Sequence, residues 1–238
     1  MLILPLNKQD QAGVPFFTLL VCLICVLVYF IAPEDAALSL AYSPHSPNVA
    51  KMFSSVFVHG DIFHLFGNLF FFYCFSRTVE SELTNKGYVI AFAVFVIATD
   101  LAYSVSTKNL IPTIGLSGVV WGFMGLFLVR YPKENINCLV WYLWVIKKIE
   151  VPAFIFVLAF LAFDIGAFRQ EQHDNINYIA HFSGFVTGVI LNIGFWGFLS
   201  KQNDPIKSRN RRFRAAPPTR DTRAGAGQGQ KNGRENNR

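Results

Sequence analysis

The stretch Gly115-Leu-Ser-Gly-Val-Val-Trp-Gly-Phe-Met-Gly-Leu-Phe-Leu-Val-Arg130 decides how this chain is built. It is apolar, yet a helix from Ser117 to Arg130 rises only about 20 Å, at about 1.5 Å per residue. The hydrocarbon core of a bilayer is about 30 Å thick. If Arg130 marks one membrane surface, Ser117 lies about 10 Å beneath the other. A hydroxyl at this depth, on a glycine-flanked helix start, indicates a functional site.

The composition around this stretch is that of an integral membrane protein. Of the 238 residues, 53% are hydrophobic and only 15% are charged, against about 25% charged in an ordinary soluble domain. The net charge of +6 is unevenly spread: residues 201–238 hold 11 basic and 3 acidic residues, so residues 1–200 carry −2. We therefore expect a membrane domain over 1–200 and a basic, disordered cytoplasmic tail over 201–238.

Six apolar segments predict an all-α membrane protein, a six-transmembrane-helix bundle with a short central fourth helix. They lie at about 15–32, 62–79, 87–106, 117–130, 151–168 and 178–200. The first is longer than the apolar core of a usual signal peptide and follows only Lys8, which favours an uncleaved helix over a cleaved signal. The connection 33–61 mixes apolar and small polar residues and is a candidate for the membrane interface.

Lysine and arginine set the expected orientation. With the N-terminus inside, 18 of the 21 basic residues lie inside, and without the tail the balance is still 7 to 3. Both termini are then cytoplasmic and Ser117 lies near the outer face. The absence of a transit peptide weakly favours a prokaryotic plasma membrane.

The rest of the sequence gives little indication of other binding partners or of a metal or cofactor. The basic cluster at 207–214 reads as a solvated flank of the last helix, with anionic lipid headgroups as the alternative. RNA binding is only weakly indicated, so no nucleic acid is expected. Cys22 and Cys25 have metal-ligand spacing but sit in an apolar run without other ligands. We expect no metal and no cofactor, and the oligomeric state is not readable.

Polar side chains at membrane depth are costly and usually functional. His64 and Asn68, four residues apart, share one helix face that His59 precedes, and can donate to a developing negative charge. An interhelical hydrogen bond is the structural alternative. Ser117 stands at a helix N-terminus, where backbone N–H groups favour an anion, although a serine there can simply cap the helix.

The last apolar segment supplies the third polar group. His181, Gly184 and Gly188 share a face, which can pack on the small-residue face made by Gly118, Gly122 and Gly125. His181 would then come beside Ser117 as its base, although a helix-buried histidine is often only structural. Asp164 and Asp100 lie in other segments, so a Ser–His dyad is expected rather than a triad. Trp121, one turn from Ser117, could stack on His181 in place of a carboxylate.

These residues resemble the motifs of the rhomboid family of intramembrane serine proteases. The motifs are His59-x4-His64-x3-Asn68, Gly115-x-Ser117-Gly118 and Ala180-His181-x2-Gly184-x3-Gly188. The resemblance covers roughly residues 12–200. It implies the rhomboid fold and hydrolysis of a peptide bond in a transmembrane substrate. Ser117 would be the nucleophile and His181 the base, while His64, Asn68 and the Ser117 N–H would form the oxyanion hole, with Gly115, Trp121 and His59 in support.

Three positions qualify this resemblance. Glu80 is similar to a structural glutamate of the family. Trp121 replaces the tyrosine often found there, and the Trp-Arg pair typical of the first external loop is absent near Lys51. A catalytically inactive membrane-helix binder and a small transporter remain the alternatives; the presence of both Ser117 and His181 counts against the former, and the lack of an internal repeat against the latter.

Overall fold

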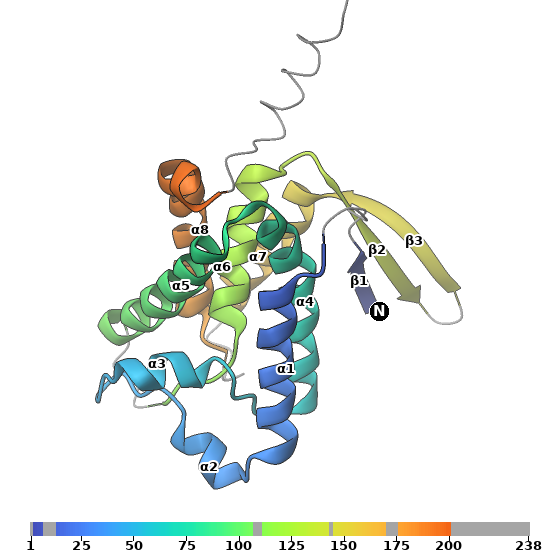
Figure 1. The fold of residues 1–238 in the computed structure, drawn as a ribbon. Helices are drawn as coiled ribbons and strands as arrows, with labels where there is room; N and C mark the ends of the chain where they lie inside the picture. The colour runs from blue at the N-terminus through green and yellow to red at the C-terminus, as the bar shows by residue number, and fades with distance from the viewer. Residues whose placement is uncertain (1, 7–12, 107–110, 143–144, 170–175, 201–238) are drawn as a thin grey trace, which may run out of the picture. The chain divides into compact units, whose positions relative to one another are not determined.

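Eight helices and one small sheet make up the described part of the chain (Figure 1). This computed structural model describes residues 2–6, 13–106, 111–142, 145–169 and 176–200. Each predicted apolar segment forms a helix: α1 Phe16–Ile31, α4 Ile62–Glu82, α5 Asn85–Ser106, α6 Ser117–Arg130, α7 Ala153–Arg169 and α8 Tyr178–Leu199. Within the described ranges, only α5 and α8 are long and apolar enough to cross a membrane, and α1 and α6 are shorter apolar helices. Six membrane spans therefore stay a prediction, and the predicted tail over 201–238 lies outside the described residues.

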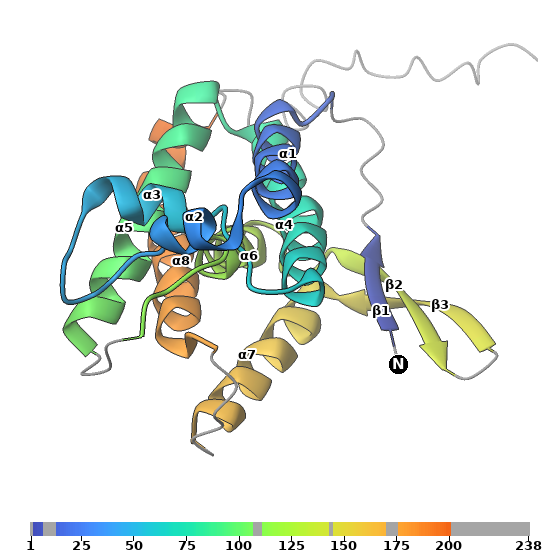
Figure 2. The same cartoon turned by 90° about the horizontal axis from the view of Figure 1, so that it is seen from below.

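A three-stranded antiparallel sheet corrects the all-α expectation. Strands β1 Leu2–Leu6, β2 Asn135–Tyr142 and β3 Val145–Pro152 lie in the order β1-β2-β3. Most of the stretch between α6 and α7 lies outside the six predicted apolar segments, but it is rich in the β-branched and aromatic residues that favour strands. Tyr142 pairs with Val145, so β2 and β3 form a hairpin that follows α6 (Figure 2).

The short helix α6 lies at the centre of the helical bundle. Every residue from Gly118 to Phe127 is buried, as expected for a helix that is apolar on all sides. Phe123 packs edge-on against Phe72 of α4 and Phe95 of α5. The views from the side and from below both show α6 surrounded by α4, α5 and α8 (Figures 1 and 2). The expected central position of the short helix is confirmed.

Helices α6 and α8 pack backbone to backbone through glycines. A β-carbon added at Gly184 would lie 2.2 Å from the Gly118 carbonyl oxygen, and one added at Gly188 would lie 2.1 Å from that of Gly122. Only glycine tolerates this approach, because any side chain would overlap the facing backbone. The predicted pairing of the two small-residue faces is confirmed.

Glu80 ties the start of α1 to α4. The backbone N–H groups of Phe17 and Thr18 donate to its carboxylate at 2.8 and 2.9 Å, and the Thr18 hydroxyl donates at 2.6 Å. The N-cap residue Pro15 makes no side-chain cap, so Glu80 satisfies N–H groups that would otherwise have no partner. The structural role expected for this glutamate is confirmed.

Large apolar side chains cover the outside of the bundle. Phe63, Phe163, Ile193 and Phe198 are between 71% and 85% exposed, and they come from α4, α7 and α8. A protein surrounded by water rarely leaves so much apolar surface uncovered. These faces fit hydrocarbon, in agreement with a membrane protein.

Candidate active site

The loop before α6 is held by the connection between α1 and α4. This connection contains the short helices α2 Glu34–Ser39 and α3 Val49–Ser55. Tyr42 and Thr113 exchange two backbone hydrogen bonds of 3.1 and 2.8 Å, and the Gly115 N–H donates to the Ser55 carbonyl at 3.0 Å. The chain is thus fixed in place just ahead of Ser117.

Gly115 makes the turn into the site possible. Its φ of +106° lies in the region that side chains disfavour. A β-carbon here would also lie 2.8 Å from Cε1 and Nε2 of His64 and 3.6 Å from Nδ2 of Asn68. The glycine therefore lets the chain turn and lets two side chains of α4 close in on the loop. This turn brings the His64–Asn68 face of α4 to the start of α6, as the motif spacing predicts.

Ser117 is the first residue of α6 and not its cap. The N-cap residue is Leu116, which makes no side-chain cap hydrogen bond. Within the described ranges, the Ser117 hydroxyl makes no hydrogen bond, and the residue is half-buried. The structural alternative, an N-capping serine, is therefore not what the structure contains. The hydroxyl stands beside the unpaired N–H groups of the helix start.

His64 and Asn68 lie in the first two turns of α4. Asp61 caps this helix, accepting hydrogen bonds from the N–H groups of Phe63 and His64, both at 2.8 Å. Asn68 is 7% exposed, and its Nδ2 has no hydrogen-bond partner in the described part of the chain. A buried amide donor without a partner is costly, so it is suited to a group that arrives with a substrate.

His59 supports His64 from the loop just before α4. The two rings meet edge to face with centroids 5.1 Å apart. Burial, and secondly the neighbouring His64, lower the pKa of His59 to about 4. His59 is therefore uncharged at neutral pH and packs as an aromatic ring against His64.

His181 lies in the first turns of α8 and is 9% exposed. Asn177 caps this helix by accepting from the Ala180 N–H at 3.0 Å. The Trp121 ring lies beside the imidazole, with centroids 5.7 Å apart and planes inclined by 31°. The expected contact between Trp121 and His181 is confirmed.

A carboxylate also contacts His181, whereas the sequence predicted a Ser–His dyad without one. Asp164 of α7 places Oδ2 2.6 Å from Nδ1 of His181, and both side chains are only 11% exposed. The sequence expectation excluded a carboxylate partner because Asp164 lies in another apolar segment, and sequence alone does not say which segments are neighbours. The one available signal was the cost of a lone aspartate in an apolar helix. Asp100, the other excluded aspartate, is buried in α5, and within the described ranges no hydrogen bond joins it to His181.

Ser117 and His181 each lie close in sequence to the glycine contact of α6 and α8. Gly118, next to Ser117, meets Gly184, which is three residues after His181. No hydrogen bond joins the Ser117 hydroxyl to the imidazole among the described residues. Such contacts are often long without substrate and shorten in the reactive complex.

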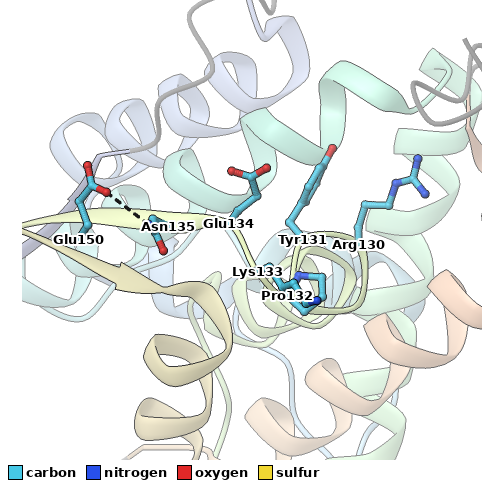
Figure 3. A pocket seen from close by; sticks show the side chains of 7 residues that line it. All are labelled: Arg130, Tyr131, Pro132, Lys133, Glu134, Asn135 and Glu150. Carbon is cyan, nitrogen blue, oxygen red and sulfur yellow. Dashed lines mark hydrogen bonds between the residues drawn. The ribbon is translucent and has the colours of Figure 1, made fainter. Parts of the chain in front are cut away.

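A hollow of about 410 Å³ lies elsewhere, at the opposite end of α6. Its lining residues are Arg130, Tyr131, Pro132, Lys133, Glu134, Asn135 and Glu150 (Figure 3). Arg130 pairs with Glu82 at 3.0 Å, and Asn135 donates to Glu150 at 3.2 Å. None of the predicted site residues lines this hollow. We therefore place the candidate active site at the Ser117 end.

Comparison with known proteins bears on this arrangement. The family description "Rhomboid domain" matches residues 46–198, more than half of the chain. The chain is 26% identical over 190 residues to "Rhomboid-like protein 11, chloroplastic" of Arabidopsis thaliana, covering 78% of this chain and 66% of that protein. It is 21% identical over 174 residues to "RHOMBOID-like protein 1" of the same plant, covering 71% and 41%. The chain thus spans just under two thirds of the first relative and about two fifths of the second. With the domain matched over most of its folded part, this chain belongs to the rhomboid family.

Proposed function

We propose that this protein is an intramembrane serine endopeptidase. The observation that carries the proposal is the meeting of four polar elements at one end of α6. Among the described residues the Ser117 hydroxyl makes no hydrogen bond, His181 contacts Trp121 one turn along α6 and lies three residues before the Gly184 contact, and His64 with Asn68 closes on Gly115. These are the parts that acyl transfer needs: a nucleophile, a base and donors for an oxyanion.

In this proposal Ser117 Oγ attacks the carbonyl carbon of the scissile bond while His181 takes its proton. The carbonyl oxygen becomes an oxyanion, held by the Asn68 amide, His64 and the Ser117 N–H. His181 then gives the proton to the leaving amine, and an acyl group remains on Ser117. Water, activated by the same imidazole, releases this acyl group.

The substrate class follows from the surroundings of the site. The bundle is covered by apolar side chains, so a protein reaching Ser117 sideways comes from the bilayer. In a stable helix every backbone carbonyl is hydrogen-bonded, so the segment must unwind before its scissile bond is accessible. We infer transmembrane proteins as substrates, cleaved at a helix-weakening stretch after a small residue, as the family resemblance implies.

The proposed orientation keeps both termini in the cytoplasm and Ser117 near the outer face. The basic residues inside, Arg77, Lys86, Arg130 and Lys133, support it. The relatives compared are plant proteins, and one is named chloroplastic. A prokaryotic plasma membrane therefore stays a prediction from the sequence alone. The division into a membrane domain over 1–200 and a tail is likewise proposed.

The proposal is tested with a reporter transmembrane substrate in detergent or liposomes. Ser117→Ala and His181→Ala should each abolish cleavage while the protein keeps its fold. Ser183→Ala is the matched control: this serine also lies on α8, but its hydroxyl donates to the Ala180 carbonyl at 3.2 Å. Cleavage that persists in either site variant would show that the dyad is wrong. Failure of the wild-type protein on any membrane substrate would favour the inactive binder.

A further inference from the structure

The hydrogen bond between His181 and Asp164 joins α8 to α7 inside the bundle. It is short, at 2.6 Å between Nδ1 and Oδ2, and both side chains are nine-tenths buried. An aspartate in a membrane helix is costly to bury and needs a partner or a function. Here the partner is the imidazole proposed as the catalytic base.

We propose that Asp164 is a positioning residue for His181, so that Ser117, His181 and Asp164 work as a triad. This inference rests on the proposed peptidase function. An ionised carboxylate can only accept a hydrogen bond, so the proton of the neutral imidazole sits on Nδ1 and is donated to Oδ2. Nε2 is then left as an unprotonated acceptor, which is the form a base needs toward a serine hydroxyl.

The charges of the pair change in the direction that favours reaction. When the Ser117 hydroxyl proton moves to Nε2, Oγ bonds to the carbonyl carbon and His181 becomes a cation. Asp164 keeps its charge and takes no proton. The pair goes from one net negative charge to none, in a buried place where opposite charges interact strongly. The carboxylate therefore stabilises the imidazolium as it forms.

A purely structural role for Asp164 makes a different prediction. Trp121 and Tyr178 already flank the imidazole, with ring centroids 5.7 and 6.0 Å away. If Asp164 only docked α7 on α8, an asparagine of the same shape would largely replace it. If Asp164 positions and charge-stabilises His181, asparagine fails, because its amide is neutral and can also donate to Nδ1 and hold the wrong tautomer.

The test compares Asp164→Asn with Asp100→Asn in the full-length protein. Asp100 is a matched control, equally buried at 7% against 8% but on α5 and without a bond to His181. We expect kcat of Asp164→Asn to fall by about 10²–10⁴-fold, the upper figure being the loss known for a chymotrypsin-type aspartate. KM should stay within about threefold, because ground-state binding is unchanged. Asp100→Asn should keep wild-type kcat, and Asp164→Glu should recover part of the loss.

Two outcomes would overturn the triad. One is an Asp164→Asn variant with wild-type kcat alongside an inactive Ser117→Ala, which leaves the peptidase proposal intact. The other comes from nitrogen-15 NMR of histidine in the wild-type protein, which needs no folded variant. We expect a His181 proton on Nδ1 and a bare Nε2; a proton on Nε2 would contradict the proposal. If wild-type protein cleaves nothing, the peptidase proposal fails instead, and the NMR result still reports on the pair.

Discussion

The strongest single-residue signal of function is the Asn68 amide. It is buried in α4, and its Nδ2 lacks a hydrogen-bond partner among the described residues, although about two helical turns earlier Asp61 accepts hydrogen bonds from two N–H groups at the start of the same helix. Leaving a buried donor unpaired costs about 1–3 kcal/mol. Proteins accept such a cost where a ligand or transition state later supplies the acceptor.

We predict that Asn68→Ala lowers kcat by up to about 10²–10³-fold, the scale of losing one oxyanion donor. The fold should be retained, because the Asn68 Nδ2 has no hydrogen-bond partner in the described part of the chain for alanine to remove. His64→Ala should act in the same direction, and the smaller end is expected because neighbouring donors can substitute. The readout is single-turnover cleavage of the reporter substrate.

The control for this loss is Asn192→Ala on α8. The Asn192 amide donates to the Leu126 carbonyl at 3.1 Å, toward the other end of α6. Its replacement should lower stability and leave kcat near wild type. Equal kcat for Asn68→Ala and the wild type would show that the oxyanion donors lie elsewhere.

The stability of the protein should depend on pH through His59. Its pKa is lowered to about 4, while an unfolded chain titrates near about 6.5. Between these values the unfolded state binds more protons, so the free energy of unfolding falls as the pH drops, by about 3 kcal/mol for this group. We expect the free energy of unfolding of His59→Phe, measured with denaturant, to fall less between pH 7.5 and pH 4.5 than that of the wild type. An equal fall in the two proteins would mean that His59 is not the group responsible.

At the scale of elements, the close contact of α6 and α8 determines how the proposed active-site residues are positioned. The two helices approach so closely that a β-carbon added at Gly184 would lie only 2.2 Å from the Gly118 carbonyl oxygen. Ser117 and His181 are each within one turn of this contact. The distance between nucleophile and base is therefore controlled by the smallest side chains in the bundle.

We predict that Gly184→Ala forces α8 away from α6 and disables the enzyme. Overpacking of this kind costs about 1–3 kcal/mol, and a displacement of about 1 Å can cost about 10²-fold in rate. Gly194→Ala, on the same helix but with open space around it, is the control. We expect Gly184→Ala to unfold at a lower temperature and to cleave more slowly than Gly194→Ala. Wild-type activity in Gly184→Ala would refute the proposed dependence of activity on this helix contact.

At the scale of the whole molecule, periodicity and small-residue spacing predicted much of the fold. The six apolar segments are all helices, the short one is central, and the glycine faces of 117–130 and 178–200 meet as expected. These features depend on local patterns that one sequence contains. The candidate site could likewise be predicted from motif residues in the segments that form α4, α6 and α8.

The sequence could not predict which elements α7 contacts or that the three strands pair. Asp164 reaches His181 only because α7 approaches α8, and nothing in residues 151–168 says which helix they face. Strands β1 and β2 pair across more than 120 residues of sequence. Long-range contacts of this sort depend on the packing of the whole bundle.

The most direct test of the account is covalent labelling of the wild-type protein in membranes with a fluorophosphonate. Such a probe reacts with a serine hydroxyl whose proton a nearby base can remove. We predict one adduct, located by peptide mass spectrometry on Ser117, and its loss in His181→Ala while Ser183→Ala labels normally. An adduct on another serine, or labelling of Ser117 that does not depend on His181, would contradict the claim that these two residues form the catalytic centre.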